Sequence, residues 1–358
     1  MDFKPAGLLT GIGSVPYADS DRALSLIFSN TPEIPYWPQM PQKGPQEGFV
    51  FQFLSPLVNM GLITIENNRA FFDTENHRWA ECLAEFYTLY MAAMEGDAGA
   101  LEAFALPEKA ASGFYAFIKH VHEKGPQEAI FFKGHLAGPL TIGFQLKDDK
   151  GRLAYYEDQL RDVLVKTLAL HGRWQAQKLS SLGRPAIIFV DEPGISVYGK
   201  SGYITVSREM IERDLNEISE QIHAAGALCG VHSCDAIDWS ILYQCRLDIV
   251  NLDAYNFGES LIPFAPELKD FIQRGGILAQ GIVPTNEKAF DENCESLVKR
   301  LHDLWDQLLQ RGIPRHDLLM RTMITPACGT GLLDPALAVH IYSLAREVSG
   351  AVRELARG

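Results

Sequence analysis

The chain has 358 residues, of which 47% are hydrophobic and 22% are charged, as is usual for a globular protein. Its net charge of −13 at pH 7 and the lack of any basic cluster argue against nucleic acid and anionic membranes as partners. The N-terminal segment has no long apolar stretch, no segment approaches a membrane-spanning length, and the six cysteines show no disulfide-framework spacing, so we expect a cytoplasmic protein.

Short β-rich segments alternate with amphipathic helical segments along most of the chain. The segments expected to form strands are 8–14, 34–39, 129–136, 185–191, 228–234, 248–253, 276–283 and 318–325. Helical patterns between them argue for parallel pairing, and eight strands close a (β/α)8 barrel. We therefore predict an α/β fold, a single TIM barrel over residues 1–358. An open doubly wound sheet is the alternative, but no GxGxxG turn follows any of these segments.

Residues 61–125 interrupt the alternation between the second and third expected strands. They are typical of several helices and are too long for a simple connection between a strand and a helix. We predict a helical insertion that can cover the barrel mouth, with packing alone as the simpler explanation.

Four potential metal ligands lie at the ends of three expected strands. His232 and Cys234 are two residues apart and therefore share one face of their strand. Asp253 ends the following strand and Cys328 follows the last one, so all four should meet where the active sites of barrels lie. Ligands scattered in this way favour a catalytic zinc site over a structural one. Ordinary buried packing of His232 and Cys234 is the alternative.

Other residues of the same types are more ordinary. His135 can line the barrel mouth, and Tyr36 and Trp37 can stack on a flat ligand, although packing is the commoner role of such side chains. The remaining cysteines are expected to be packing residues: Cys82, Cys229, Cys245 and Cys294.

Taken together, the motifs resemble cobalamin-independent methionine synthase. They resemble most specifically the short single-barrel branch related to that enzyme's catalytic half and to the uroporphyrinogen decarboxylase superfamily. The similarity covers most of residues 11–331 and is carried by the HxC pair at 232–234, the acidic residue at the next strand end, PxCG around Cys328, IGS at 12–14, GHLAGPLTIG at 134–143 and VDEPGIS at 190–196.

The resemblance implies roles for particular residues. Ile12, Gly13 and Ser14 would hold the carboxylate of homocysteine through their backbone and the serine hydroxyl. Asp191 would bind the homocysteine amine, with Glu192 beside it as the alternative partner.

The chain also departs from the family's pattern. The acidic zinc ligand of the family is a glutamate, whereas Asp253 is shorter by one methylene. The family's proton-transferring histidine has no counterpart in 281–290, where Asn286 cannot act as an acid. The family's glutamate near the second strand has no clear counterpart either, Gln39 and Glu47 being the nearest candidates. We expect no second, folate-presenting barrel.

A zinc ion with two thiolates, one carboxylate and one imidazole suits thiol activation better than water activation. The function that follows from the resemblance is a zinc-dependent methyltransferase that forms methionine from homocysteine, with methylcobalamin or a methylated corrinoid protein as the expected donor. Alternatives are methyl transfer to another thiol such as coenzyme M, a uroporphyrinogen decarboxylase-like protein without methyltransferase activity, and a non-catalytic binding protein. Asp191 favours an amino-acid thiol, because a sulfonate acceptor has no ammonium group.

Overall fold

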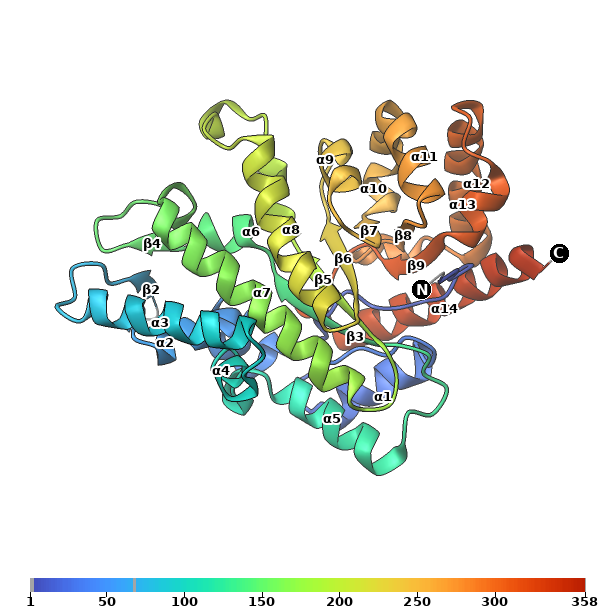
Figure 1. Cartoon of the computed structure of the whole chain (residues 1–358). Helices are drawn as coiled ribbons and strands as arrows, with labels where there is room; N and C mark the ends of the chain where they lie inside the picture. The colour runs from blue at the N-terminus through green and yellow to red at the C-terminus, as the bar shows by residue number, and fades with distance from the viewer. Residues whose placement is uncertain (1–2, 67–68, 358) are drawn as a thin grey trace.

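A parallel sheet of six strands lies at the centre of the molecule (Figure 1). The computed structural model describes residues 3–66 and 69–357. The strand order is β3-β5-β6-β7-β8-β9, and nearly every residue in these strands is buried, as expected for continuous apolar runs covered on both faces. The strands are β3 (Phe132–Ala137), β5 (Ala186–Asp191), β6 (Leu228–Ser233), β7 (Ile249–Leu252), β8 (Ile277–Val283) and β9 (Thr322–Pro326).

The first two expected strands, 8–14 and 34–39, are joined to this sheet by single bridges and not by ladders. Leu9 pairs with Ile324 of β9, Tyr36 pairs with Lys133 of β3, and Ser14 pairs with Gln39. The two segments thus connect the two outer strands of the sheet. In 34–39 the prolines at 35 and 38 have no N–H to donate, which limits the ladder that this segment can form.

Two strand predictions begin too early, 129–136 where β3 starts at Phe132 and 318–325 where β9 starts at Thr322. Residues 318–320 belong to helix α13 (Arg315–Met320), and β9 begins only at Thr322. The helix starts directly after Pro314, its N-cap residue, and the Thr322 hydroxyl donates a hydrogen bond back to the Leu318 carbonyl at 2.6 Å.

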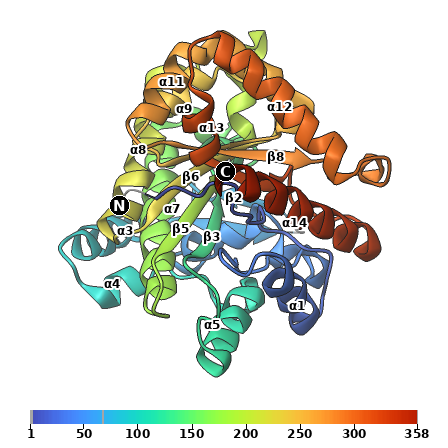
Figure 2. The same ribbon diagram turned by 90° about the vertical axis from the view of Figure 1, so that its right-hand side faces the viewer.

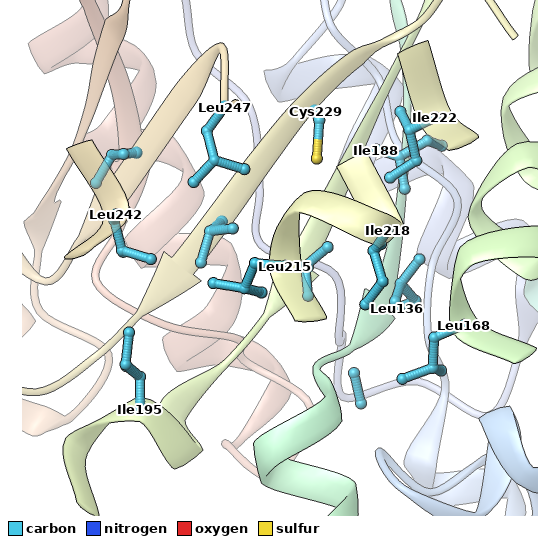
Figure 3. Packing of buried hydrophobic residues seen from close by; sticks show 14 of the residues in the cluster. Leu136, Leu168, Ile188, Ile195, Leu215, Ile218, Ile222, Cys229, Leu242 and Leu247 are labelled. Carbon is cyan, nitrogen blue, oxygen red and sulfur yellow. The ribbon is translucent and has the colours of Figure 1, made fainter. Parts of the chain in front are cut away.

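Helices surround the sheet in both views (Figures 1 and 2). On the outer face of β3, β5 and β6, apolar side chains interdigitate with those of α7 and α8 (Figure 3). Cys229 is among these packed residues, as its expected packing role requires. The longer helices are α1 (Ser20–Asn30), α3 (Trp79–Met94), α5 (Ser112–Lys124), α7 (Asp158–Ser180), α8 (Arg208–Ala224), α11 (Ala265–Gln273), α12 (Cys294–Gln310) and α14 (Pro335–Arg357). The shorter ones are α2 (Ser55–Asn59), α4 (Ala98–Glu102), α6 (Pro139–Gly143), α9 (Trp239–Gln244), α10 (Ala254–Phe257) and α13.

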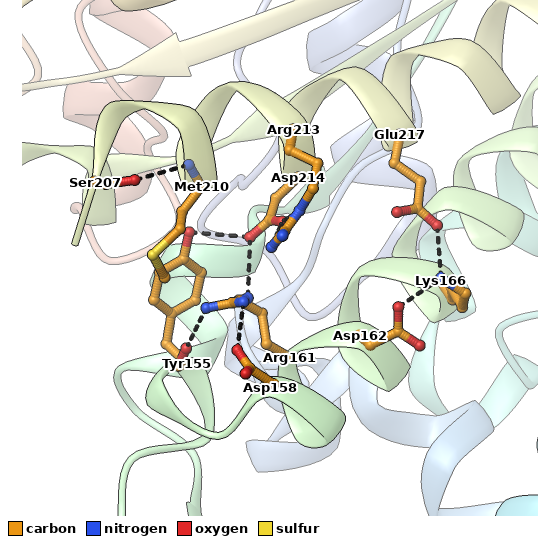
Figure 4. Close-up of polar contacts among 10 residues, drawn as sticks. All are labelled: Tyr155, Asp158, Arg161, Asp162, Lys166, Ser207, Met210, Arg213, Asp214 and Glu217. Carbon is orange, nitrogen blue, oxygen red and sulfur yellow. Dashed lines mark hydrogen bonds and ion pairs between the residues drawn. The ribbon is translucent and has the colours of Figure 1, made fainter. Parts of the chain in front are cut away.

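Polar contacts also tie α7 to α8 (Figure 4). Arg161 lies 3.8 Å from Asp214, a buried carboxylate that also accepts a hydrogen bond from the Tyr155 hydroxyl at 3.0 Å. Lys166 bridges α7 and α8 through Glu217 at 3.1 Å. These groups satisfy one another, so they hold the two helices together and leave no free charge there.

The segment 61–125 contains the expected helices α3, α4 and α5. It also contains an antiparallel hairpin that was not predicted, β1 (Ile63–Glu66) with β2 (Arg69–Phe72), extended by β4 (Lys147–Asp148). Helices α3 and α4 pack on α7, and α5 packs on α1, so packing against the outer helices accounts for them. No helix of the described chain is both long and apolar enough to cross a membrane.

Candidate metal centre

The carboxyl ends of neighbouring strands bring polar side chains together on the inner face of the sheet. Asp191 at the end of β5 is paired with His232 of β6, and His232 is paired in turn with Asn251 of β7. All three side chains are buried, with exposed fractions of 5% or less. A row of buried polar groups at strand ends is the usual setting of an active site in folds of this class.

His232, Cys234 and Cys328 form one cluster. One ring nitrogen of the histidine and the two Sγ atoms all lie within 4.8 Å of one another. Cys328 reaches the cluster on the segment after β9, which is held to the end of β8 by a hydrogen bond from Ala327 N–H to the Val283 carbonyl at 2.8 Å. One nitrogen and two sulfurs in this arrangement fit a zinc ion. The structure therefore brings together three of the four expected ligands.

The hydrogen bonds of Asn251 determine which nitrogen of His232 is available. The Asn251 amide NH2 donates to the Ala279 carbonyl at 2.8 Å and to the Thr325 hydroxyl at 2.9 Å, so its Oδ1 faces His232 Nδ1. Nδ1 must then carry the proton, and Nε2 keeps its lone pair. Nε2 is buried and has no hydrogen-bond partner in the described chain. An imidazole fixed through its other nitrogen is the usual state of a metal ligand.

The two thiols of the cluster differ in acidity. A hydrogen bond with Cys328 lowers the pKa of Cys234, whereas that same bond and burial raise the pKa of Cys328. For His232, burial opposes protonation, but the neighbouring Cys328 thiol and Asp191 carboxylate leave its pKa raised. Cys234 is thus the first of the two thiols to become a thiolate, the form that binds metal.

Asp253 lies next to this cluster but outside it. Its carboxylate caps helix α10, accepting hydrogen bonds from Asn256 N–H at 2.9 Å and from the Asn256 side chain at 2.7 Å. Burial raises the pKa of Asp253, and the nearby His232 opposes that rise. The role of Asp253 as a fourth ligand stays a prediction.

Asp191 and Glu192 are adjacent in sequence but have different surroundings. Burial raises the pKa of Asp191 to about 6, and its Oδ1 is buried with no partner in the described chain. Glu192 instead accepts hydrogen bonds from Leu140 N–H at 2.8 Å and Thr141 N–H at 2.7 Å, and from the Thr141 hydroxyl. Its carboxylate caps the first turn of α6 and so already has partners within the chain, unlike Asp191 Oδ1. The alternative role of Glu192 as amine partner stays a prediction.

Segment 12–14 lies against the segment that follows Cys328. The Ser14 hydroxyl accepts a hydrogen bond from Gly331 N–H at 3.1 Å, and the Ser14 carbonyl accepts one from Thr330 N–H at 2.9 Å. The Ile12 carbonyl accepts a hydrogen bond at 2.6 Å from the buried Lys133 ammonium, whose pKa burial lowers to about 8. The expected carboxylate-binding segment is therefore next to the metal cluster.

Gln39 and Glu47, the two candidates for the family's glutamate near the second strand, make hydrogen bonds within the chain. Gln39 donates to the Gln52 side chain at 3.2 Å, and Glu47 accepts from the Ser112 hydroxyl at 2.5 Å. The sequence reasoning overlooked Asn251 and Lys133. Each is a polar residue inside an otherwise apolar run, IVNL and IFFKGHL, and a buried polar side chain is the signal that could have identified them.

No family model matches the sequence, and no curated protein sequence matches it. Among solved structures, the chain is similar to a B12-independent methionine synthase from Shewanella sp. W3-18-1, determined in complex with selenomethionine, with 19% identity, a TM-score of 0.46 and coverage of 68% of this chain and 67% of that one. It is also similar to a Bacteroidetes-affiliated GH5 cellulase, with 9% identity, a TM-score of 0.40 and coverage of 69% and 79%. A third is an endo-β-1,4-mannanase double mutant of Cellulomonas fimi, with 12% identity, a TM-score of 0.37 and coverage of 65% and 57%. At these values none of the three assigns an activity to this chain.

Proposed function

We propose that the chain is a zinc-dependent methyltransferase that converts homocysteine to methionine. The observation that carries this proposal is the cluster of His232, Cys234 and Cys328, three zinc-type donors brought together from β6 and from the segment after β9. The unpartnered Nε2 of His232 fits a missing metal ion, because a buried imidazole nitrogen without a partner is otherwise costly. Asp253 is the proposed fourth ligand, and segments 8–14 and 34–39 are proposed to complete an eight-stranded barrel around the site.

Zinc bound to this donor set would lower the pKa of a substrate thiol and so supply a thiolate at neutral pH. The protein's own groups would then select and orient the substrate. The unpartnered carboxylate oxygen of Asp191 is the proposed acceptor for the substrate ammonium group. Segment 12–14, adjacent to Cys328, is the proposed site of the substrate carboxylate.

A methylated corrinoid is the proposed methyl donor. The methyl carbon would form a bond with the substrate sulfur while its bond to cobalt breaks, and the electron pair of that bond would remain on the corrinoid as cobalt(I). This leaving group needs no proton. A folate leaving group needs one, yet the segment after β8 carries no histidine, and the Asn286 side chain there accepts a hydrogen bond from Lys288 N–H.

Two other functions fit the site less well. Coenzyme M carries a sulfonate and no ammonium group, so it would leave the buried Asp191 carboxylate without a partner. A porphyrin with several carboxylates would need several cationic groups. Lys133 is buried nearby and donates to the Ile12 carbonyl, and the described groups at the strand ends are two thiols, an imidazole and the carboxylates of Asp191 and Asp253.

The test is an assay of methionine formation by the zinc-loaded protein, with homocysteine as acceptor and methylcobalamin or methyltetrahydrofolate as donor. We expect methionine from methylcobalamin and little or none from the folate. Faster methionine formation from the folate would overturn the donor assignment alone. No methionine from either donor, with zinc at one ion per chain, would contradict the proposed function.

A further inference from the structure

A histidine on β3 is buried inside the sheet with neither ring nitrogen paired. His135 is 1% exposed, and its Nδ1 and Nε2 have no hydrogen-bond partner among the described residues. Burial holds the pKa of this imidazole well below its usual value, so the ring is neutral and carries one N–H and one lone pair. Buried polar atoms are rarely left without a partner, so this ring is a candidate contact for a bound molecule.

The position of the His135 ring is fixed by its neighbours. It stacks on Trp37 with the ring centroids 3.9 Å apart. Phe53 packs edge-on against it, with the two ring centroids 6.4 Å apart. Trp37 is itself held by a hydrogen bond from its indole N–H to Gln175 at 2.9 Å, and Gln175 donates to the His135 carbonyl at 2.8 Å. The ring therefore has little freedom to turn toward a partner within the chain.

His135 lies directly against segment 12–14. A Cβ atom at Gly13 would lie 3.0 Å from His135 Nδ1 and Cε1, so a larger residue there would have to push the imidazole ring away by a few tenths of an ångström. Lys133, two residues earlier on the same face of β3, anchors the segment through the Ile12 carbonyl. Within the described chain, the N–H groups of Gly13 and Ser14 donate no hydrogen bond. Unpaired donors from β3 and from segment 12–14 thus gather at one place.

An unpaired acceptor lies at the end of the neighbouring strand β5. Asp191 on β5 is paired in register with Ala137 on β3, which is two residues after His135. The side chains of His135 and Asp191 therefore lie on the same, inner face of two neighbouring strands. Donors on one side and a carboxylate on the other match the two charged groups of an α-amino acid.

We propose that His135 donates a hydrogen bond to the carboxylate of the substrate, so that the site selects thiols that are amino acids. This inference rests on the proposed function, because it assigns the substrate carboxylate of that same site. A hydrogen bond to a charged group is strong enough that its loss should raise the dissociation constant about tenfold or more.

The test is calorimetric binding to the zinc-loaded protein of homocysteine and of 3-aminopropane-1-thiol, which is homocysteine without its carboxylate. His135→Leu should weaken homocysteine binding about tenfold or more and leave binding of the aminothiol within about twofold. His135→Gln keeps an N–H donor and should retain more of the homocysteine affinity than His135→Leu does. If the leucine variant does not fold, the glutamine variant alone tests whether the donor contributes to binding.

Three results would count against the inference. Equal losses for both thiols would show a merely structural histidine, and an unchanged homocysteine affinity would show that only water occupies the space. Wild-type protein that binds zinc but neither thiol would overturn the proposed function together with the role of His135. The first two results, in contrast, would overturn the role of His135 alone.

Discussion

In the metal-free cluster, the hydrogen bond between Cys234 and Cys328 lowers the pKa of the first thiol and raises that of the second. A zinc ion would displace the thiol protons and bind both thiolates. Replacing either cysteine with serine removes a sulfur ligand without a large change of shape.

We expect Cys234→Ser and Cys328→Ser to lower zinc affinity by at least about 100-fold, which is the largest usual effect of changing a group that only hydrogen-bonds to a ligand. Cys294→Ser is the matched control, because Cys294 begins α12 and lies outside the cluster. Zinc content after dialysis against a chelator measures the effect. Full zinc occupancy in both cluster variants would show that the metal, if any, binds elsewhere.

Removing the charge of Asp191 is expected to weaken the binding of homocysteine and to raise the free energy of unfolding of the protein. Asp191→Asn removes the partner of the ammonium group, so the KM for homocysteine should rise about tenfold or more. The wild-type protein should also lose homocysteine affinity more steeply than the variant as the pH falls through about 6, where this carboxylate takes up a proton. An unchanged KM in the variant would remove Asp191 from the substrate site.

The stability effect of the same substitution has a definite sign. The pKa of Asp191 is raised from 3.8 to about 6 in the folded protein, so the folded state binds more protons than the unfolded state between these values. Stability from this group is therefore present at low pH and lost as the pH rises toward 6. At pH 7, Asp191→Asn should raise the free energy of unfolding of the metal-free protein by up to about 3 kcal/mol. Denaturant titrations at pH 7 measure this change, and a lower free energy of unfolding would contradict it.

At the scale of elements, one side chain of β7 connects four strands. Asn251 contacts His232 on β6, the Ala279 carbonyl on β8 and Thr325 on β9. The strands that form the site are thus held in position by the same residue that holds the imidazole.

Replacing Asn251 with leucine should free the His232 ring and lower zinc affinity about 10- to 100-fold. Thr325→Val, which removes only one of the acceptors of the Asn251 amide, is the control and should have a smaller effect. Competition with a zinc chelator gives both affinities. Equal zinc affinity in wild type and in a folded leucine variant would show that Asn251 does not position the ligand.

The sequence predicted the six central strands because each is a short, mostly apolar run, a signal that depends on burial alone. It could not show that 8–14 and 34–39 make only single bridges, since the loss of a ladder depends on how prolines and glycines meet their neighbours. Hairpin β1–β2 was missed because ITIE and RAFF are short and only partly buried.

The candidate site was predictable to a similar extent. The spacing of His232 and Cys234 on one strand fixes their shared face, and Cys328 was placed by its position after the last strand. The tertiary partners were not predictable. Nothing in VDEPG indicates that Glu192 caps α6 while Asp191 stays unpaired, and nothing in DIVNLD indicates that Asn251 fixes a histidine tautomer.

At the scale of the whole molecule, the outer helices and the strand ends have separate tasks. The ion pairs between α7 and α8 are satisfied within the chain, whereas the unpaired buried atoms of His135, Asp191 and His232 all face the inner side of the sheet. Single buried atoms without a partner also occur on outer helices, for example on His120 and His302. What indicates a site for ligands is that those of His135, Asp191 and His232 lie on three neighbouring strands of the sheet.

The central claim is that His232, Cys234 and Cys328 hold a zinc ion that meets the substrate thiol. Zinc X-ray absorption spectroscopy of the purified protein, with and without homocysteine, tests it directly. We predict two sulfur ligands at about 2.3 Å in the free protein and a third when homocysteine is added. A sulfur count that does not change on adding homocysteine, or zinc bound by nitrogen and oxygen alone, would contradict the account.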